Sequence, residues 1–437
     1  MFGKDSTMTK LLLSLILLGT FTLTVKAGDT SYDQLLKQIS PDASIQAPVP
    51  ALDMSGMSAI VPDGHYWVTA VAADKAARTR LLNAGMDIVE IHGDKVSGTA
   101  PYNTLKALST EKSMVVESAM PLADYADALT SQKDFPAADA AYHNYAETTS
   151  LLKDMVSKNS DVASLFSIGK TTEGRDIWCL RINSTAKGTA ASTKPGAFFM
   201  GNIHAREHLA NEVPLLFAAY LFDHRNDATI KQYISTLDIY IIPMANPDGV
   251  EYDIKGGKYQ MHRKNTRINP DKSVGVDLNR NFDSWWCAEG ASHEYWADTY
   301  CGPSAFSEPE SQEIKAFFET HKNLRTHISY HSYASEILYP WGGNDADVDD
   351  ANDKAAFVKM ADAMASMTGY SAQKSSAMYI ATGDSCDWAY AEGKVLAFTI
   401  ELEGSSFYPG AAIITKTVNS NIKAAVYLLS MTANPYK

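Results

Sequence analysis

The stretch Gly201-Asn202-Ile203-His204-Ala205-Arg206-Glu207-His208 decides how the surrounding chain folds. The apolar run Ala197-Phe198-Phe199-Met200 precedes it and predicts a short buried strand. The apolar segment 213–222 follows it and favours a helix. The stretch is therefore expected on a turn between a strand and a helix. Ligands of open α/β sheets bind outside the carboxyl ends of the strands, so this turn is a candidate binding site.

His204 and Glu207 are three residues apart, and in a turn both side chains can face one point. An imidazole nitrogen and a carboxylate oxygen suit zinc. By itself His-x-x-Glu is more often a solvated helix face, so the pair is a weak signal. His208 does not strengthen it, because the spacing of the His-Glu-x-x-His proteases is absent.

A third ligand is available in the segment 326–333, which predicts a strand running into a loop. His331 falls at the carboxyl end of this strand, and we expect it at the same edge of the sheet as His204. A close pair with one distant ligand is a common layout of catalytic zinc sites, in which water takes the fourth position. His327 lies inside the strand, where a core or edge position explains it.

Composition and charge limit the classes of protein to which the chain can belong. The chain has 437 residues, of which 45% are hydrophobic and 20% charged, as in ordinary globular proteins. Its formal net charge of -13 argues against nucleic acid as a general partner.

A signal peptide is predicted over residues 1–27. The pattern consists of a basic residue, Lys10, the apolar run 11–18 and the cleavage-like residues Val25-Lys26-Ala27. No later stretch is long and apolar enough to span a bilayer, so we expect a secreted protein, extracellular or periplasmic.

Residues 66–117 alternate between strand-like and helical patterns in the order β-α-β-β-α-β, the ferredoxin-like arrangement. This α+β unit has no cluster of catalytic residue types and precedes the polar linker 118–136. We interpret residues 28–134 as an N-terminal prosegment with its linker, the alternative being a small structural domain. Residues 135–437 show alternating strand-like and helical runs with no second linker, so we expect one large α/β domain.

Export permits disulfides, and the chain has four cysteines. Cys287 and Cys301 flank a polar, aromatic loop, and we pair them; a loop of this size contributes roughly 3 kcal/mol in the chain-entropy model. Cys179 lies in a strand-like run and is expected to be a buried free thiol.

Eight short sequence blocks stand in order along the second part of the chain: His204-Ala205-Arg206-Glu207, Asn246-Pro247-Asp248-Gly249, His262-Arg263-Lys264-Asn265, Val276-Asp277-Leu278-Asn279-Arg280-Asn281, Phe306-Ser307-Glu308-Pro309-Glu310, Tyr330-His331-Ser332-Tyr333, Tyr379-Ile380-Ala381-Thr382-Gly383 and Phe398-Thr399-Ile400-Glu401-Leu402. In these blocks and their order the chain resembles the zinc metallocarboxypeptidases of the carboxypeptidase A and B type over about residues 136–437. The resemblance implies one zinc ion at His204, Glu207 and His331, a mixed central sheet flanked by helices, and peptide or protein C-termini as substrate.

The same resemblance implies roles for the other residues. Glu401 matches the general base, and Arg263 matches the arginine that stabilises the oxyanion. Arg280 with Asn279 matches the clamp for the free C-terminal carboxylate, over which Tyr379 closes. The expected substrate-binding residues are Arg206, Asn279, Arg280, Ser332, Tyr333, Tyr379, Asp384 and Cys386. An activating protease is expected as a partner of the precursor.

The specificity loop leaves the preferred C-terminal residue open. The resemblance places Cys386 at the base of the pocket for the substrate's C-terminal side chain, where a small apolar thiol favours neutral side chains. Asp384, two residues earlier, has the reach and charge for a basic side chain. Two alternatives to a carboxypeptidase remain: a zinc amidase acting on cell-wall peptides or acylated amino acids, and a non-catalytic binding module. The presence of all three ligands and Glu401 counts against the latter.

Overall fold

The turn 202–208 joins β7 (Gly196–Gly201) to α7 (Leu209–Asp223), as predicted. The protein is described by a computed structural model over residues 64–110, 115–122, 139 and 141–437, all within one compact unit, Pro50–Lys437. The predicted signal peptide and the cleavage point near residue 134 lie outside the described residues. Every residue of β7 is buried, which explains its unbroken apolar sequence.

β7 lies in the middle of a mixed eight-stranded sheet with the order β11-β10-β12-β9-β7-β8-β6-β5. The central strands β12, β9, β7 and β8 are parallel to one another, so their carboxyl ends meet at one edge. The remaining pairings include antiparallel ones on both sides. The other strands are β5 (Ala163–Lys170), β6 (Asp176–Ile182), β8 (Asp238–Ile242), β9 (Leu324–Ser332), β10 (Glu336–Tyr339), β11 (Ser371–Lys374) and β12 (Leu396–Leu402).

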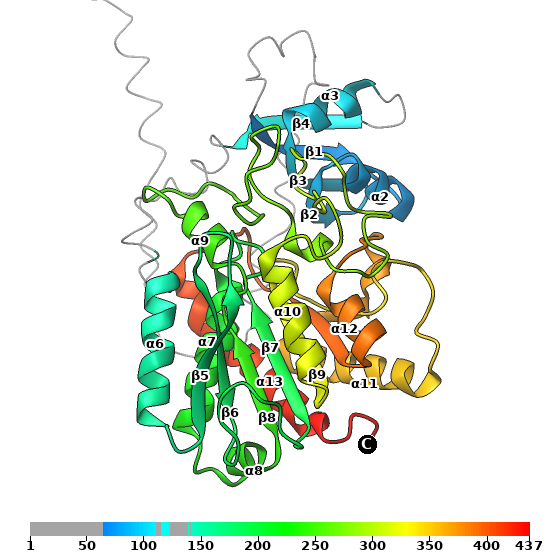
Figure 1. Cartoon of the computed structure of the whole chain (residues 1–437). Coiled ribbons are helices and arrows are strands. Elements are labelled where there is room, and N and C mark those ends of the chain that lie inside the picture. Colours follow the sequence, from blue (N-terminus) through cyan, green and yellow to red (C-terminus); the bar gives the residue numbers. More distant parts are fainter. Residues whose placement is uncertain (1–63, 111–114, 123–138, 140) are drawn as a thin grey trace, which may run out of the picture. The chain divides into compact units, whose positions relative to one another are not determined.

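Helices cover both faces of this sheet (Figure 1). Phe199 of β7 belongs to the core cluster that contains the buried faces of α7, α11 and α13, whereas Phe198 belongs to the cluster with α10 and α12. Alternate residues of the strand thus enter opposite cores, and the predicted α/β fold with a mixed central sheet is confirmed. The helices are α6 (Tyr145–Lys158), α8 (Ala228–Thr236), α9 (Pro247–Asp253), α10 (Pro309–Thr320), α11 (Ala351–Thr368), α12 (Ser385–Gly393) and α13 (Ile414–Thr432).

The first described unit has the predicted β-α-β-β-α-β order and a four-stranded antiparallel sheet, β2-β3-β1-β4. Asp74 caps its first helix by accepting a hydrogen bond from the N–H of Ala77. This small α+β unit buries its own apolar core, including Val68, Leu81 and Val96. Its elements are β1 (His65–Val71), α2 (Lys75–Asn83), β2 (Asp87–His92), β3 (Lys95–Pro101), α3 (Tyr102–Thr110) and β4 (Val115–Pro121).

The sequence also favours a strand at residues 274–276 and a turn at Asn246-Pro247-Asp248-Gly249, and the structure differs from both expectations. Residues 274–276 form no strand beyond a single bridge between Val274 and Ile268, because the chain turns into a short helical turn at Leu278–Arg280. Asn246-Pro247-Asp248-Gly249 is not a free turn but begins α9, with Asn246 as its N-cap.

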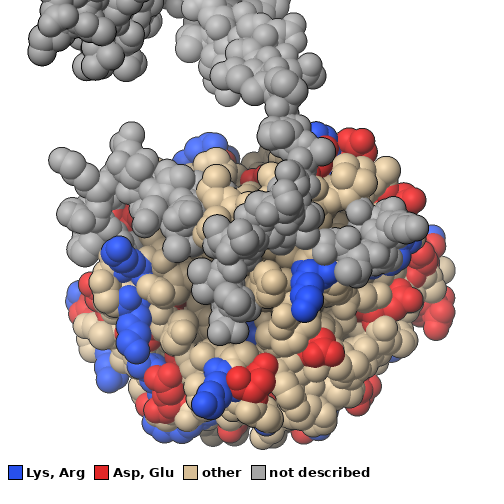
Figure 2. Space-filling view, turned by 90° about the horizontal axis from the view of Figure 1, so that it is seen from above, with Lys and Arg blue, Asp and Glu red and all other residues tan. Residues whose placement is uncertain are grey.

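Acidic and basic side chains are interspersed on the face shown in Figure 2, in keeping with the absence of a basic stretch in the sequence. Among the described residues, no helix has both the length and the apolar character needed to cross a membrane.

Candidate active site

Three buried side chains converge at the carboxyl ends of β7 and β9. His204 Nδ1 lies 2.8 Å from Glu207 Oε1, and His331 Nδ1 lies 3.1 Å from Glu207 Oε2. The two Nδ1 atoms are 3.1 Å apart. Such a convergence of electron-pair donors away from water is stabilised by a cation, and two imidazoles with one carboxylate are a zinc donor set. These residues therefore fit the ion that the resemblance implies.

The other imidazole nitrogens of this cluster have polar neighbours that fix the rings. His204 Nε2 lies 3.3 Å from Asp277 Oδ1, and His331 Nε2 lies 3.1 Å from Ser329 Oγ. Contacts of this kind orient metal-binding histidines. His327, which also lies in β9, instead contacts the carbonyl oxygen of Phe198 through Nδ1 and is a core residue.

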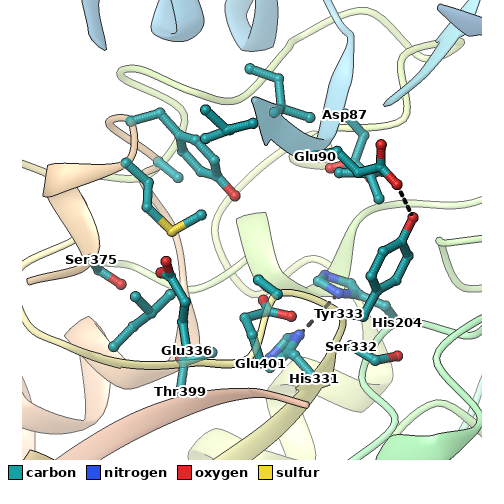
Figure 3. A pocket seen from close by; sticks show the side chains of 18 of the residues that line it. Asp87, Glu90, His204, His331, Ser332, Tyr333, Glu336, Ser375, Thr399 and Glu401 are labelled. Atoms are coloured by element: carbon teal, nitrogen blue, oxygen red, sulfur yellow. Dashed lines mark hydrogen bonds between the residues drawn. The ribbon is translucent and has the colours of Figure 1, made fainter. Parts of the chain in front are cut away.

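Glu401 lies beside this cluster because of strand register. It is paired with His331 across the parallel strands β12 and β9, and with Glu336 across the antiparallel strands β12 and β10. Figure 3 shows Glu401 next to His331 at the wall of a cavity. Burial and the nearby carboxylates of Glu207 and Glu336 raise the pKa of Glu401 well above its ordinary value. A carboxyl group in this position, beside the metal-binding residues, is placed to accept a proton from water when it is ionised.

Arg263 places a fixed positive charge at the same point. Its Nε donates to Asp277 Oδ2 at 2.9 Å, and its Nη1 lies 3.3 Å from His204 Nδ1. Burial opposes both charges, but their mutual attraction lowers the pKa of Asp277 and raises that of Arg263. The guanidinium is thus held in one orientation beside the metal-binding residues, where negative charge on a carbonyl oxygen would be stabilised.

Arg280 and Asn279 line the same cavity, which has a volume of about 640 Å³. Arg280 Nε donates to the carbonyl oxygen of Gly290 at 2.8 Å, and Nη1 donates to that of Asn279 at 2.8 Å. Asn279 Oδ1 accepts from the N–H of Ser385 at 3.0 Å. Backbone groups therefore fix the direction of both side chains.

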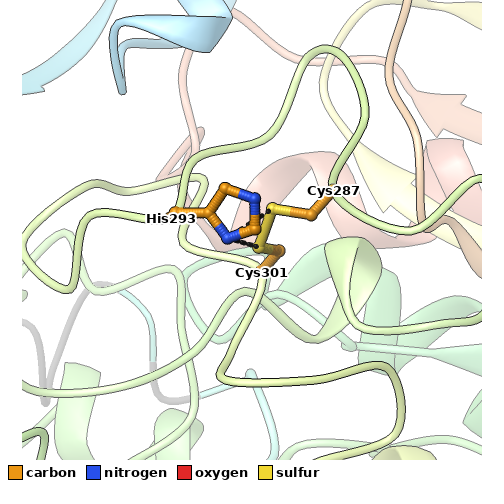
Figure 4. A group of neighbouring side chains, drawn as sticks. All are labelled: Cys287, His293 and Cys301. Atoms are coloured by element: carbon orange, nitrogen blue, oxygen red, sulfur yellow. Dashed lines mark hydrogen bonds between the residues drawn. A yellow bond between two sulfur atoms is a disulfide. The ribbon is translucent and has the colours of Figure 1, made fainter.

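The disulfide between Cys287 and Cys301 closes the loop that contains Gly290, so the predicted pairing is confirmed (Figure 4). His293 Nδ1 lies 3.5 Å from Cys287 Sγ. Because the two sulfurs are bonded to each other, this group is a disulfide with a histidine neighbour and not a thiolate metal site. Cys179 is a buried free thiol, as predicted.

The other predicted residues separate into two groups. Ser332, Tyr333, Tyr379 and Asp384 line the cavity, whereas Arg206 and Cys386 do not. Arg206 is completely buried, and its guanidinium contacts Thr99, Asp87 and the ring of Phe407. Cys386 lies behind Thr399, whose hydroxyl donates to its sulfur at 3.3 Å.

Thr399, and not the expected Cys386, therefore forms this part of the cavity wall. Glu336 and Gln373 also belong to the wall and were not predicted. The position of Thr399 two residues before Glu401 on one strand was the signal that could have identified it, since alternate residues of a strand share a face.

The small α+β unit closes the cavity on one side. Asp87 of β2 contacts Arg206, and its Oδ2 lies 3.3 Å from Arg263 Nη1. Glu90 of the same strand accepts a hydrogen bond from the hydroxyl of Tyr333 at 2.8 Å. Both acidic side chains thus engage residues expected to bind substrate, as Figure 3 shows for Glu90 and Tyr333.

Comparison with known proteins agrees with this geometry. The family model for zinc carboxypeptidases matches residues 148–424. A zinc carboxypeptidase of Saccharothrix mutabilis subsp. capreolus is 32% identical over 380 residues, covering 82% of this chain and 87% of that protein. Human carboxypeptidase A1 is 33% identical over 309 residues, covering 68% of this chain and 72% of that protein.

The fold also agrees with that of solved carboxypeptidase structures. The crystal structure of carboxypeptidase A from Helicoverpa armigera superposes with a TM-score of 0.68 at 23% identity, covering 85% of this chain and 98% of that one. The chain therefore belongs to the zinc carboxypeptidase family, as its sequence motifs imply, and is a zinc-dependent metallocarboxypeptidase.

Proposed function

We propose that the residues at the carboxyl ends of β7, β9 and β12 remove single residues from the free C-termini of peptides. His204, Glu207 and His331 would hold the zinc ion, which would supply polarisation of the peptide carbonyl and a lowered pKa of water. Glu401 takes the proton of the attacking water and passes it to the leaving amine. The observation that carries this proposal is the register of β12 and β9, which pairs Glu401 with His331.

Arg263 stabilises the negative charge that develops on the carbonyl oxygen. Its orientation is already fixed by Asp277, so no reorganisation is needed during the reaction. Arg280 and Asn279 hold the C-terminal carboxylate of the substrate, and Tyr379 closes over it. Ser332 and Tyr333 contact the residues that precede the scissile bond, and Arg206 joins them once removal of the prosegment takes Asp87 away from its guanidinium. Asp384 faces the side chain of the C-terminal residue, and Cys386 supports this pocket from behind Thr399.

Binding of the substrate's C-terminal carboxylate by Arg280 and Asn279 distinguishes a carboxypeptidase from an amidase with the same zinc-binding residues. A peptide with a free C-terminus and the same peptide with a C-terminal amide would be compared at equal concentration. We expect hydrolysis of the free peptide and a loss of at least about a hundredfold for the amide, because Arg280 then has no carboxylate to bind. Equal rates for both peptides would contradict the assignment of the clamp.

We also propose that the protein is made as an exported precursor. Residues 1–27 direct export, residues 28–134 form the prosegment, and a protease activates the domain 135–437 by cleaving in the linker. The contacts of Asp87 and Glu90 with Arg263 and Tyr333 support an inhibitory prosegment. Peptide hydrolysis would be measured before and after limited proteolysis of the purified precursor, and equal activity in both would contradict the inhibitory role.

A further inference from the structure

One wall of the active-site cavity contains a carboxylate to which no role has yet been given. Glu336 is the first residue of β10 and is paired with Glu401, while Leu338 is paired with Thr399. Directly paired residues of antiparallel strands place their side chains on the same face. Glu336 therefore shares a face with the proposed general base, and both line the cavity (Figure 3).

The surroundings of Glu336 are polar but contain no compensating positive charge. Its Oε2 accepts a hydrogen bond from Gln373 Nε2 at 2.6 Å. Burial raises its pKa, and Gln373 only partly opposes this effect. Within the part of the chain that the structure describes, no lysine or arginine forms a salt bridge with Glu336. A half-buried carboxylate in this situation gains from any cation that enters the cavity.

A second carboxylate in the same cavity has one oxygen available. Asp384 Oδ1 caps α12 by accepting from the N–H groups of Cys386 and Asp387, both at 2.9 Å. Its Oδ2 is buried and accepts from no backbone N–H or basic side chain of the described residues, and its carboxyl group has that of Asp387 as a neighbour. This oxygen lies 3.6 Å from the position that a Cβ on Gly342 would occupy, so the missing side chain of Gly342 leaves space beside it.

The wall around these two carboxylates is well suited to an extended, positively charged side chain. Gln373, Ser375 and Thr399 supply neutral polar groups, and Leu338 and Met378 supply apolar surface for a methylene chain. Arg280 lines the same cavity, so a substrate carboxylate bound there has its C-terminal side chain within the cavity.

We propose that Glu336 is a specificity-determining residue that acts with Asp384 to select substrates ending in lysine or arginine. This inference rests on the proposed carboxypeptidase function and on the placement of the C-terminal carboxylate at Arg280. Glu336 supplies a charge at the end of the pocket formed by β10 and β11, and Asp384 supplies one at the start of α12. Neither residue takes part in bond breaking.

The test compares peptides that differ only in a C-terminal Lys, Arg, Leu or Phe. We expect the full-length protein, activated by limited proteolysis, to have a higher kcat/KM for Lys and Arg. Glu336→Gln should lower kcat/KM for Lys and Arg by about 10- to 100-fold, the usual cost of a lost charged contact, and change Leu and Phe by less than about threefold. Asp384→Asn should act in the same direction. The matched control is Glu392→Gln, which removes the same charge at an exposed position of α12. It should leave kcat/KM unchanged for all four peptides.

A positioning role through Glu401 predicts a different result. If Glu336 only raises the proton affinity of Glu401, then Glu336→Gln shifts the acidic limb of the pH profile for all four substrates equally. That outcome, or an unchanged Lys to Leu ratio in a variant of unchanged melting temperature, would overturn the inference. If the unaltered protein hydrolyses Leu and Phe peptides but not Lys or Arg, the inference fails while the carboxypeptidase function stands. Hydrolysis of none of the four would instead contradict the function itself.

Discussion

The hydroxyl of Thr79 accepts a hydrogen bond from the backbone N–H of Ile380 at 3.2 Å, which ties α2 to the residue after Tyr379. Arg78, the preceding residue of α2, donates to the carbonyl oxygen of Met378 at 3.3 Å, on the other side of Tyr379. The ring of Tyr379 packs against the core of the small α+β unit. The unit therefore holds the segment of the tyrosine that is proposed to close over the substrate.

Removing this contact should weaken the restraint on Tyr379 in the precursor. Thr79→Val keeps the shape of the side chain but has no oxygen to accept from Ile380. We expect a several-fold increase in peptide hydrolysis by the uncleaved precursor and no change after limited proteolysis, because the cleaved enzyme no longer contains α2. An unchanged rate of peptide hydrolysis by the precursor, or an increase that persists after proteolysis, would contradict this explanation.

Asp87 should contribute more to inhibition than Thr79, because it engages Arg206 and Arg263 together. Asp87→Asn removes the charge and leaves two buried guanidinium groups without this partner. We expect basal hydrolysis by the precursor to rise by about tenfold or more, in line with the cost of a lost buried charge contact. Asp94→Asn, at an exposed position of the same unit, is the control. Equal basal activities for the two variants would exclude Asp87 as an inhibitory contact.

The disulfide should affect substrate binding more than turnover. Cys287 and Cys301 are separated by 14 residues, and the loop between them contains the carbonyl oxygen that holds Arg280. In the double variant with serine at both positions, we expect a higher KM with a smaller change in kcat. We also expect a loss of roughly 3 kcal/mol in the free energy of unfolding. An unchanged KM would show that the loop does not position the clamp.

The buried carboxyl group of Glu310 should make stability depend on pH. Its Oε2 accepts from Asn265 Nδ2 at 3.1 Å, but burial dominates and raises its pKa from 4.5 to about 7. The folded state thus binds more protons than the unfolded state between these values, and stability falls as pH rises from about 4.5 to about 7. The difference corresponds to about 3 kcal/mol. Glu310→Gln stays neutral, so the gap in unfolding free energy between it and the natural protein should widen from pH 5 to pH 8. A constant gap would contradict this role.

The metal-binding residues could be predicted because their signals are local. The spacing of His204 and Glu207, and the place of His331 at the end of a predicted strand, indicate the residue types and the edge of the sheet, and the resemblance carried by the ordered sequence blocks turns this weak signal into a zinc site. The structure places them as expected, within 4.8 Å of one another. The order of elements in the small unit could be predicted for the same reason, since each strand and helix has its own periodicity.

The part of the pocket wall formed by β10, β11 and β12 could not be predicted in this way. Glu336 reads as an ordinary charged residue at the start of a strand, and only its pairing with Glu401 places it in the cavity. Cys386 was expected to face the substrate, but the packing of α12 on β12 puts Thr399 in front of it. The contact of Asp87 with Arg206 joins residues 119 positions apart, and no local pattern in either segment indicates it.

The central claim is that Glu401 transfers the proton while His204, Glu207 and His331 hold the zinc. Zinc content and turnover measured together on purified Glu401→Gln and His331→Ala test it most directly. We expect Glu401→Gln to fold and to retain about one zinc, because it removes no ligand. Its kcat should fall by at least about a hundredfold, as expected for the loss of a general base. His331→Ala should lose both zinc and activity. Near-normal turnover in Glu401→Gln, or full zinc retention in His331→Ala, would contradict the account.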